Sequence, residues 1–162
     1  MSIFDLTGKV ALVTGAGRGI GRGIAEELAS QGATIACASR TTEQLEEVAQ
    51  SIRDAGGTAV SIPLDISDMA SLDQTLATID SEFGRLDILV NNAGMNARQP
   101  IDEVTEENYD RIMDVNLKGL YFLSQKAARY MKKNGAGKII NIGSLTTGYA
   151  LAKVSVYTAT KG

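Results

Sequence analysis

A tyrosine and a lysine stand four residues apart near the end of the sequence, at Tyr157 and Lys161. On a helix, this spacing places the phenol and the ammonium group on the same face. A neighbouring positive charge favours the phenolate, so we expect Tyr157 to exchange a proton near neutral pH. Ser144, thirteen residues upstream, offers a second hydroxyl at the end of an apolar run. These residue types suit proton transfer to or from an oxygen atom of a bound substrate.

A glycine-rich segment near the other end has the composition of a phosphate-binding turn. It reads Thr14-Gly-Ala-Gly-Arg-Gly-Ile-Gly21 and separates an apolar run from an amphipathic one. Gly15 would allow a sharp turn, Gly19 the approach of backbone N–H groups to a pyrophosphate, and Gly21 close packing of the following helix. The spacing differs from G-x-G-x-x-G, so a tight turn without a ligand remains an alternative. Together with Tyr157, the turn suggests redox chemistry on a nicotinamide cofactor.

The end of the second apolar run distinguishes between two such cofactors. A free 2′-hydroxyl is usually held by an acidic residue about 20 residues beyond the glycines. The sequence there, Ala36-Cys-Ala-Ser-Arg40, has no acidic residue. Arg40, together with Arg18 in the turn, would hold a 2′-phosphate, so the sequence favours NADP(H) over NAD(H). The alternative is that both are solvated loop arginines.

Composition excludes several classes of protein. A chain of 162 residues with 44% hydrophobic and 22% charged residues is typical of one soluble domain. The net charge of −3 argues against a nucleic-acid partner, and no segment approaches the ~20 apolar residues of a membrane helix. The absence of histidine excludes His-dependent nucleophiles and His-ligated metals. The only cysteine, Cys37, is expected to be buried in a strand, and we expect a cytoplasmic protein with a small-molecule substrate and no metal.

Short apolar runs alternate with amphipathic segments along the whole sequence. In the first amphipathic segment, Ile20, Ile24 and Leu28 are expected to form the buried face of a helix. One long helical region is expected over residues 105–133, and a last helix from Ser155. Strands that are apolar on both faces and separated by helices indicate an α/β fold with a doubly wound parallel sheet of the Rossmann type, in a single domain over residues 1–162. The expected strands are residues 9–14, 34–39, 58–64, 86–90 and 138–142.

Four motifs occur in a diagnostic order: the glycine-rich turn, Asn91-Asn-Ala-Gly94, Ser144, and Tyr157-x-x-x-Lys161. With these motifs, the sequence resembles the short-chain dehydrogenase/reductases from about residue 7 to residue 162. The resemblance implies hydride transfer between a nicotinamide cofactor and a carbonyl or alcohol, with Tyr157 as the acid or base. Lys161 would promote ionisation of the tyrosine and hold the nicotinamide ribose, and Ser144 would hydrogen-bond the substrate oxygen. Asn116 would help to hold a water molecule near the lysine.

The resemblance also implies which residues contact the cofactor. Asp65, after the third strand, would contact the adenine, and the segment from Asn91 to Gly94 would line the cofactor cleft. The implied set is Gly15, Arg18, Gly19, Ile20, Gly21, Ser39, Arg40, Asp65, Ile66, Asn92, Ala93, Gly94, Tyr157 and Lys161.

The substrate is less closely defined. Polar residues in the segments 95–100 and 145–149 favour a hydrophilic substrate, and Arg98 is a candidate partner for a carboxylate, with a solvated arginine as the alternative. The sequence is most similar to family members that act on sugars and sugar acids, such as the gluconate 5-dehydrogenase group. Reductases of 3-oxoacyl chains on acyl carrier protein are the main alternative.

Family members continue well beyond the catalytic lysine. We therefore expect residues 1–162 to be the N-terminal part of a longer oxidoreductase that has the five strands above but lacks the family's C-terminal strands. The full-length form is expected to be a homodimer or homotetramer. A function of another class, a nucleotide-binding module without turnover, remains open.

Overall fold

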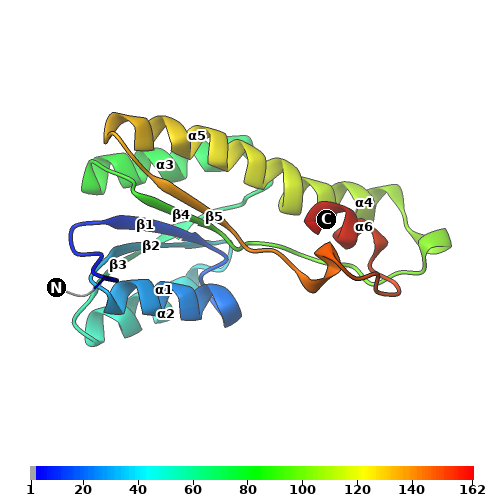
Figure 1. Cartoon of the computed structure of the whole chain (residues 1–162), viewed down its shortest axis with the longest axis horizontal. Coiled ribbons are helices and arrows are strands. Elements are labelled where there is room, and N and C mark those ends of the chain that lie inside the picture. The colour runs from blue at the N-terminus through cyan, green and yellow to red at the C-terminus, as the bar shows by residue number, and fades with distance from the viewer. Residues whose placement is uncertain (1–2) are drawn as a thin grey trace.

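A five-stranded parallel sheet runs through the middle of the molecule, as Figure 1 shows for the computed structural model, which describes residues 3–162. The strand order is β3-β2-β1-β4-β5, with β1 at the centre and the crossover connections on both sides of it. This order confirms the predicted doubly wound Rossmann architecture. The strands are β1 (Val10–Thr14), β2 (Thr34–Ser39), β3 (Thr58–Pro63), β4 (Ile88–Asn91) and β5 (Lys138–Asn141).

Helices cover both faces of the sheet. In Figure 1, α1 and α2 lie below the sheet, whereas α3 and α5 lie above it. The helices α4 and α6 contact each other beyond the end of the sheet. The α-helices are α1 (Gly19–Ser30), α2 (Thr42–Asp54), α3 (Met69–Phe83), α4 (Glu106–Met113), α5 (Leu120–Lys133) and α6 (Ser155–Lys161).

The sheet separates two apolar clusters, because its central strands present buried side chains on both faces. Leu12 and Leu89 pack with apolar residues of α3 and α5, whereas Val13 and Ile35 pack with residues of α1 and α2. Cys37 is buried in the second cluster, and this burial raises the pKa of its thiol to about 12. The cysteine is therefore a packing residue of β2, as predicted.

The buried face of α1 differs from the predicted one. Ile20 is 68% exposed, whereas Gly21, Ala25 and Ala29 are the buried residues of the helix. Small side chains at the buried positions allow α1 to lie close to the sheet. The prediction that Ile20 belongs to the core-facing stripe was wrong, although Ile24 and Leu28 are partly buried against the core.

The long helical region of residues 105–133 is not a uniform α-helix. It begins after Thr105, whose hydroxyl accepts a hydrogen bond from the backbone N–H of Asn108 at 3.3 Å. Between α4 and α5, the segment Asp114–Gly119 adopts π-helical geometry. Single-turn π segments are rare and often occur at functional sites. Asn116 lies in this segment.

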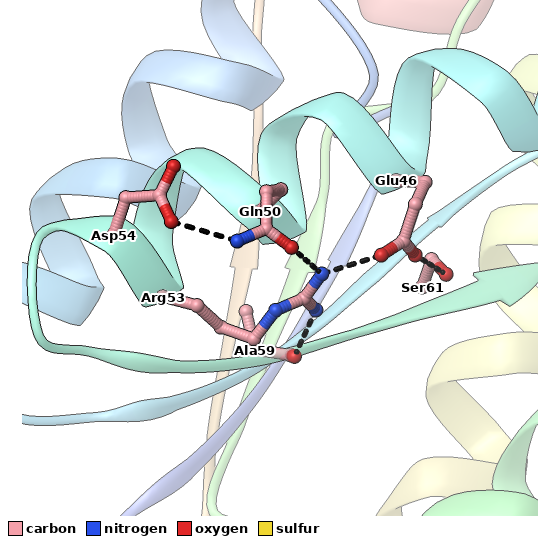
Figure 2. Close-up of polar contacts among 6 residues, drawn as sticks. All are labelled: Glu46, Gln50, Arg53, Asp54, Ala59 and Ser61. Carbon is pink, nitrogen blue, oxygen red and sulfur yellow. Dashed lines mark hydrogen bonds and ion pairs between the residues drawn. The ribbon is translucent and has the colours of Figure 1, made fainter.

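A polar network fastens α2 to the edge strand β3 (Figure 2). Arg53 donates hydrogen bonds to the backbone oxygen of Ala59 at 3.0 Å and to the side chain of Gln50 at 2.7 Å, and it pairs with Glu46. Ser61 donates to the other oxygen of Glu46 at 2.7 Å. These contacts hold α2 against the edge of the sheet.

The opposite edge of the sheet is formed by β5, whose residues are all exposed. Two apolar side chains of this strand, Ile139 and Ile140, are among the exposed large hydrophobic residues. On its other side, β5 pairs with β4, in register from Ile88↔Lys138 to Asn91↔Asn141.

Candidate functional site

The glycine-rich turn lies between β1 and α1 and has the backbone geometry that only glycine adopts readily. Gly15 and Gly19 have φ angles of +65° and +57°. A Cβ atom on Gly21 would lie 2.2 Å from the carbonyl oxygen of Gly15, far inside van der Waals contact. The start of α1 therefore packs directly against the glycine-rich segment, as predicted from the sequence for Gly21.

The turn is tied to the Asn91–Gly94 segment by Thr14. The hydroxyl of Thr14 accepts hydrogen bonds from the backbone N–H groups of Asn92 and Ala93, both at 3.0 Å, and donates to Val90. The side-chain amide of Asn92 donates to the Thr14 carbonyl oxygen at 2.9 Å. This role of Thr14 was not predictable from the sequence, because the contact joins segments almost 80 residues apart.

A cleft of about 540 Å³ lies over the carboxyl ends of the first four strands. It brings together twelve of the fourteen predicted cofactor-contacting residues; Tyr157 and Lys161 lie in the neighbouring cleft. Several wall residues, including Thr41, Gln44 and Val115, were not predicted, because they belong to none of the motifs. The complete lining is Gly15, Gly17, Arg18, Gly19, Ile20, Gly21, Ala38, Ser39, Arg40, Thr41, Gln44, Leu64, Asp65, Ile66, Asn92, Ala93, Gly94, Met95 and Val115.

Two exposed arginines and one carboxylate set the charge of this cleft. Arg18 comes from the glycine-rich turn and Arg40 from the end of β2. Asp65 follows β3, and its carboxylate accepts hydrogen bonds from the hydroxyl and the backbone N–H of Ser67 at 2.6 and 2.9 Å. The Ser67 hydroxyl, helped by the charge of Arg40, lowers the pKa of Asp65 below its usual value. The cleft thus offers two cations at one end and a fixed carboxylate close by.

A second cleft of about 470 Å³ contains the residues first singled out for their chemistry. Ser144, Tyr157 and Lys161 all line it. It shares Ile20, Asn92, Gly94 and Met95 with the first cleft, so the two form one continuous depression. The remaining lining residues are Asn96, Arg98, Ile142, Gly143, Leu145, Thr146, Leu151 and Val154.

The lysine of this cleft is held by the chain that follows β5. Lys161 Nζ donates to the backbone oxygen of Ile142 at 2.7 Å. The hydroxyl of Thr147 donates in turn to the Lys161 carbonyl oxygen at 2.6 Å. The helix α6 is therefore attached at two points to the segment that carries Ser144.

Asn116, a predicted catalytic residue, is buried and lines neither cleft. Its side-chain oxygen accepts from the Met95 N–H, and its amide donates to the Met95 carbonyl oxygen, both at 2.8 Å. The amide also donates to the Thr160 hydroxyl at 3.2 Å. The π-helical segment is thereby joined both to the wall of the depression and to α6. The role of Thr160 as this link was not predicted from the sequence.

Two loops at the mouth of the second cleft also contact each other. The backbone N–H of Gln99 donates to the carbonyl oxygen of Lys153 at 3.0 Å. Lys153 has a φ of +64°, which non-glycine residues rarely adopt. The side chain of Gln99 accepts from Asn108 of α4 at 3.1 Å. These contacts position the segment that carries Arg98, which is exposed at the mouth.

Within residues 3–162, no three His, Cys, Asp or Glu side chains gather as a metal ion would require. Over the same residues, no helix combines the length and the apolar character needed to cross a membrane.

Comparisons with known proteins identify the family of the chain. Residues 9–162 match the family described as short chain dehydrogenase. The chain is 38% identical over 160 residues to the gluconate 5-dehydrogenase of Gluconobacter oxydans (strain 621H), covering 99% of this chain and 62% of that protein. It is 44% identical over 158 residues to the 2-dehydro-3-deoxy-D-gluconate 5-dehydrogenase of Bacillus subtilis (strain 168), covering 98% and 61%.

A solved structure shows the same fold. The crystal structure of a gluconate 5-dehydrogenase from Burkholderia cenocepacia J2315, in complex with NADP and tartrate, superimposes with a TM-score of 0.92 at 39% identity. The match covers 98% of this chain and 62% of that one. The chain thus spans a little over three fifths of the length of these relatives. From its fold, its ordered motifs and this match over nearly its whole length, the chain belongs to the short chain dehydrogenase family of oxidoreductases.

Proposed function

We propose that the protein is an NADP(H)-preferring oxidoreductase that interconverts a hydroxyl and a carbonyl group on a sugar acid or a similar polar substrate. The observation that carries this proposal is the continuous depression that joins the glycine-rich turn to Ser144, Tyr157 and Lys161. A dinucleotide is long enough to need both halves of such a depression, and the proton-transfer groups lie at the end where a nicotinamide belongs.

The residues of the first cleft fit a dinucleotide. The turn exposes backbone N–H groups at the start of α1, where the helix dipole favours a pyrophosphate. A Cβ at Gly21 would collide with Gly15, so the cradle depends on glycine. Arg18 and Arg40, which line this cleft, would hold a 2′-phosphate, and Asp65 would contact the adenine. The NADP complex of the Burkholderia relative supports this choice of cofactor.

The side chains of the second cleft carry out the proton transfer. Tyr157 donates a proton to the carbonyl oxygen in reduction and accepts it from the alcohol in oxidation. Lys161, one helical turn away, holds the nicotinamide ribose. Ser144 hydrogen-bonds the substrate oxygen, and Asn116 supports α6 through Thr160. A bound nicotinamide supplies or accepts the hydride at the substrate carbon.

Asn96 and Arg98 make the mouth of the second cleft polar. We propose that Arg98 pairs with the carboxylate of a sugar acid, because guanidinium groups bind carboxylates by charge-assisted hydrogen bonds. The printed names of the Gluconobacter and Bacillus relatives, which refer to gluconate and to 2-dehydro-3-deoxy-D-gluconate, support a substrate of this class.

We further propose a cytoplasmic protein that works as a homo-oligomer. Its single cysteine is buried and reduced in β2, which suits a reducing compartment. Tyr109, Leu117 and Tyr121 are exposed on the long helical region and could contribute to a subunit interface.

The proposal is tested by incubating the purified protein with NADP⁺ and a panel of gluconate, other sugar acids and neutral polyols. Formation of the reduced cofactor is followed by its near-ultraviolet absorbance. We expect reduction of NADP⁺ with at least one sugar acid. Binding of NADP⁺ without reduction by any of these substrates, or by 3-hydroxyacyl thioesters, would favour a nucleotide-binding module without turnover.

A further inference from the structure

The hydroxyl of Ser144 is held by one neighbouring residue, Thr146. Ser144 Oγ accepts a hydrogen bond from the backbone N–H of Thr146 at 3.2 Å. The Thr146 hydroxyl lies 3.0 Å from the same oxygen atom. Thr146 is 5% exposed, whereas Ser144 is partly exposed and lines the second cleft.

The direction of the bond between the two hydroxyls follows from the surroundings of Thr146. No second hydrogen-bond partner for Thr146 Oγ1 lies among residues 3–162. If Ser144 donated this bond, the proton of the buried Thr146 hydroxyl would have no acceptor, which costs about 1–3 kcal/mol. If Thr146 donates, both hydroxyl protons are accommodated, because that of Ser144 remains available to the cleft.

We propose that Thr146 is a positioning residue that fixes Ser144 as a hydrogen-bond donor to the substrate oxygen. The backbone N–H and the hydroxyl of Thr146 occupy the two acceptor sites of Ser144 Oγ, so its proton points towards the cleft that also contains Tyr157. A donor in this place favours negative charge on the substrate oxygen, the charge that develops during hydride transfer. The two hydrogen bonds from Thr146 and the donor role of Ser144 are thus compatible, because the bonds use the lone pairs of Ser144 Oγ and the donor role uses its proton.

The orientation of Ser144 can be measured without any substrate. We would determine the three-bond Hα–Hβ couplings of Ser144 by nuclear magnetic resonance in the parent protein and in Thr146→Val and Thr146→Ser. Couplings of a single rotamer are expected for the parent and for Thr146→Ser, and averaged couplings for Thr146→Val. Single-rotamer couplings in Thr146→Val would overturn the proposal.

A matched control is available in α3. Thr75 is also fully buried, and its hydroxyl has no hydrogen-bond partner within residues 3–162. Thr75→Val removes the same atoms from a buried site away from both clefts, so it should leave the Ser144 couplings unchanged. A change in Thr75→Val as large as that in Thr146→Val would overturn the proposal, because the effect would then be general.

The catalytic part of this inference rests on the proposed function and has its own test. Because Thr146→Val removes one neutral hydrogen bond, we expect this variant to lower kcat about fivefold to tenfold with little change in KM. Thr146→Ser, which keeps the hydroxyl, should retain the parent kcat. In a Ser144→Ala background, Thr146→Val should have no further effect, because Thr146 acts only through Ser144. If Thr146→Val lowered kcat as much in the Ser144→Ala background as in the parent, the positioning role would be contradicted. A parent rate that survives both Ser144→Ala and Tyr157→Phe would instead contradict the proposed catalytic roles of these two residues, and the Hα–Hβ couplings of Ser144 would still test the positioning role of Thr146.

Discussion

Lys161 Nζ donates a hydrogen bond of 2.7 Å to the carbonyl oxygen of Ile142, the residue that follows β5 by one position. This bond connects the helix of Tyr157 to the segment of Ser144, two residues further along the chain. The relative position of the two hydroxyl-bearing residues is therefore set by the sheet and by the lysine together. It explains how a short helix of seven residues can hold the tyrosine in place.

Arg40 is predicted to determine the preference for NADPH. Arg40→Ala should weaken NADPH binding by about tenfold or more, since charge-assisted hydrogen bonds contribute about 1.5–3 kcal/mol, and should change NADH binding little. Fluorescence titration with each reduced cofactor measures both affinities. Arg129→Ala, at an exposed position on α5, makes the same change in net charge and should affect neither. Equal losses for NADPH and NADH in Arg40→Ala would remove the argument for a 2′-phosphate site.

Gly21 and Gly23 offer a comparison within one helix. The Cβ of Gly21→Ala would collide with the Gly15 carbonyl oxygen, so we expect a loss of about 1–3 kcal/mol in the free energy of unfolding and weaker cofactor binding. At Gly23, no atom lies within 4 Å of the added Cβ. Gly23→Ala should therefore stabilise the helix by about 0.5–1 kcal/mol. Chemical denaturation measures the free energy of unfolding of both variants. Equal changes in Gly21→Ala and Gly23→Ala would show that the close contact at Gly21 has no energetic role.

Asp87 is predicted to make the stability of the protein depend on pH in the acid range. Its carboxylate accepts hydrogen bonds from Arg85 at 2.6 and 2.8 Å and from the backbone N–H of Val10 at 2.9 Å. The guanidinium of Arg85 in particular lowers the pKa of Asp87. A carboxyl with a depressed folded-state pKa stabilises the fold fully above its unfolded-state pKa of about 3.9, and this stabilisation is lost as the pH falls through the folded-state value.

The measurement is the free energy of unfolding of Asp87→Asn at several pH values. At neutral pH we expect a loss of about 1–2 kcal/mol, because the charged acceptor is removed. Below about pH 4, the difference from the parent should shrink. Asp102→Asn, at an exposed position, serves as the control and should follow the parent curve. A constant difference at every pH would argue against a depressed pKa as its origin.

Arg98 is predicted to select substrates that carry a carboxylate. Arg98→Gln should raise KM for gluconate about tenfold and leave KM for a neutral polyol such as sorbitol unchanged, because only the acid loses a charge-assisted contact. Steady-state kinetics with both substrates test this directly. A loss of the same size for both would indicate that Arg98 supports the loop and does not recognise charge.

The fold was largely predictable from the sequence, because its signals are local. Each strand is a short apolar run, and glycines such as Gly32 and Gly84 mark helix ends by their positive φ angles. Boundaries were less accurate: β4 begins at Ile88, two residues later than expected. The exposure of Ile20 was not predictable, since its periodic spacing resembles that of a core residue.

The site was predictable where its residues carry motifs and obscure where they act through contacts between distant segments. Ser144, Tyr157 and Lys161 were identified from type and spacing and do share a cleft. Thr14 and Thr160 were missed, because a threonine has no distinctive pattern until its partner is known. The π-helical turn around Asn116 was also missed, because the sequence periodicity of a long helix does not reveal one wider turn.

The most direct test of the account is the rate of NADP⁺ reduction by a sugar acid in the parent and in Tyr157→Phe. Phenylalanine retains the ring and removes only the hydroxyl that transfers the proton. Because general acid–base catalysis contributes about 10²–10⁴-fold, we predict that kcat falls by a factor of at least about 10². A Tyr157→Phe protein that retains the parent rate would contradict the mechanism.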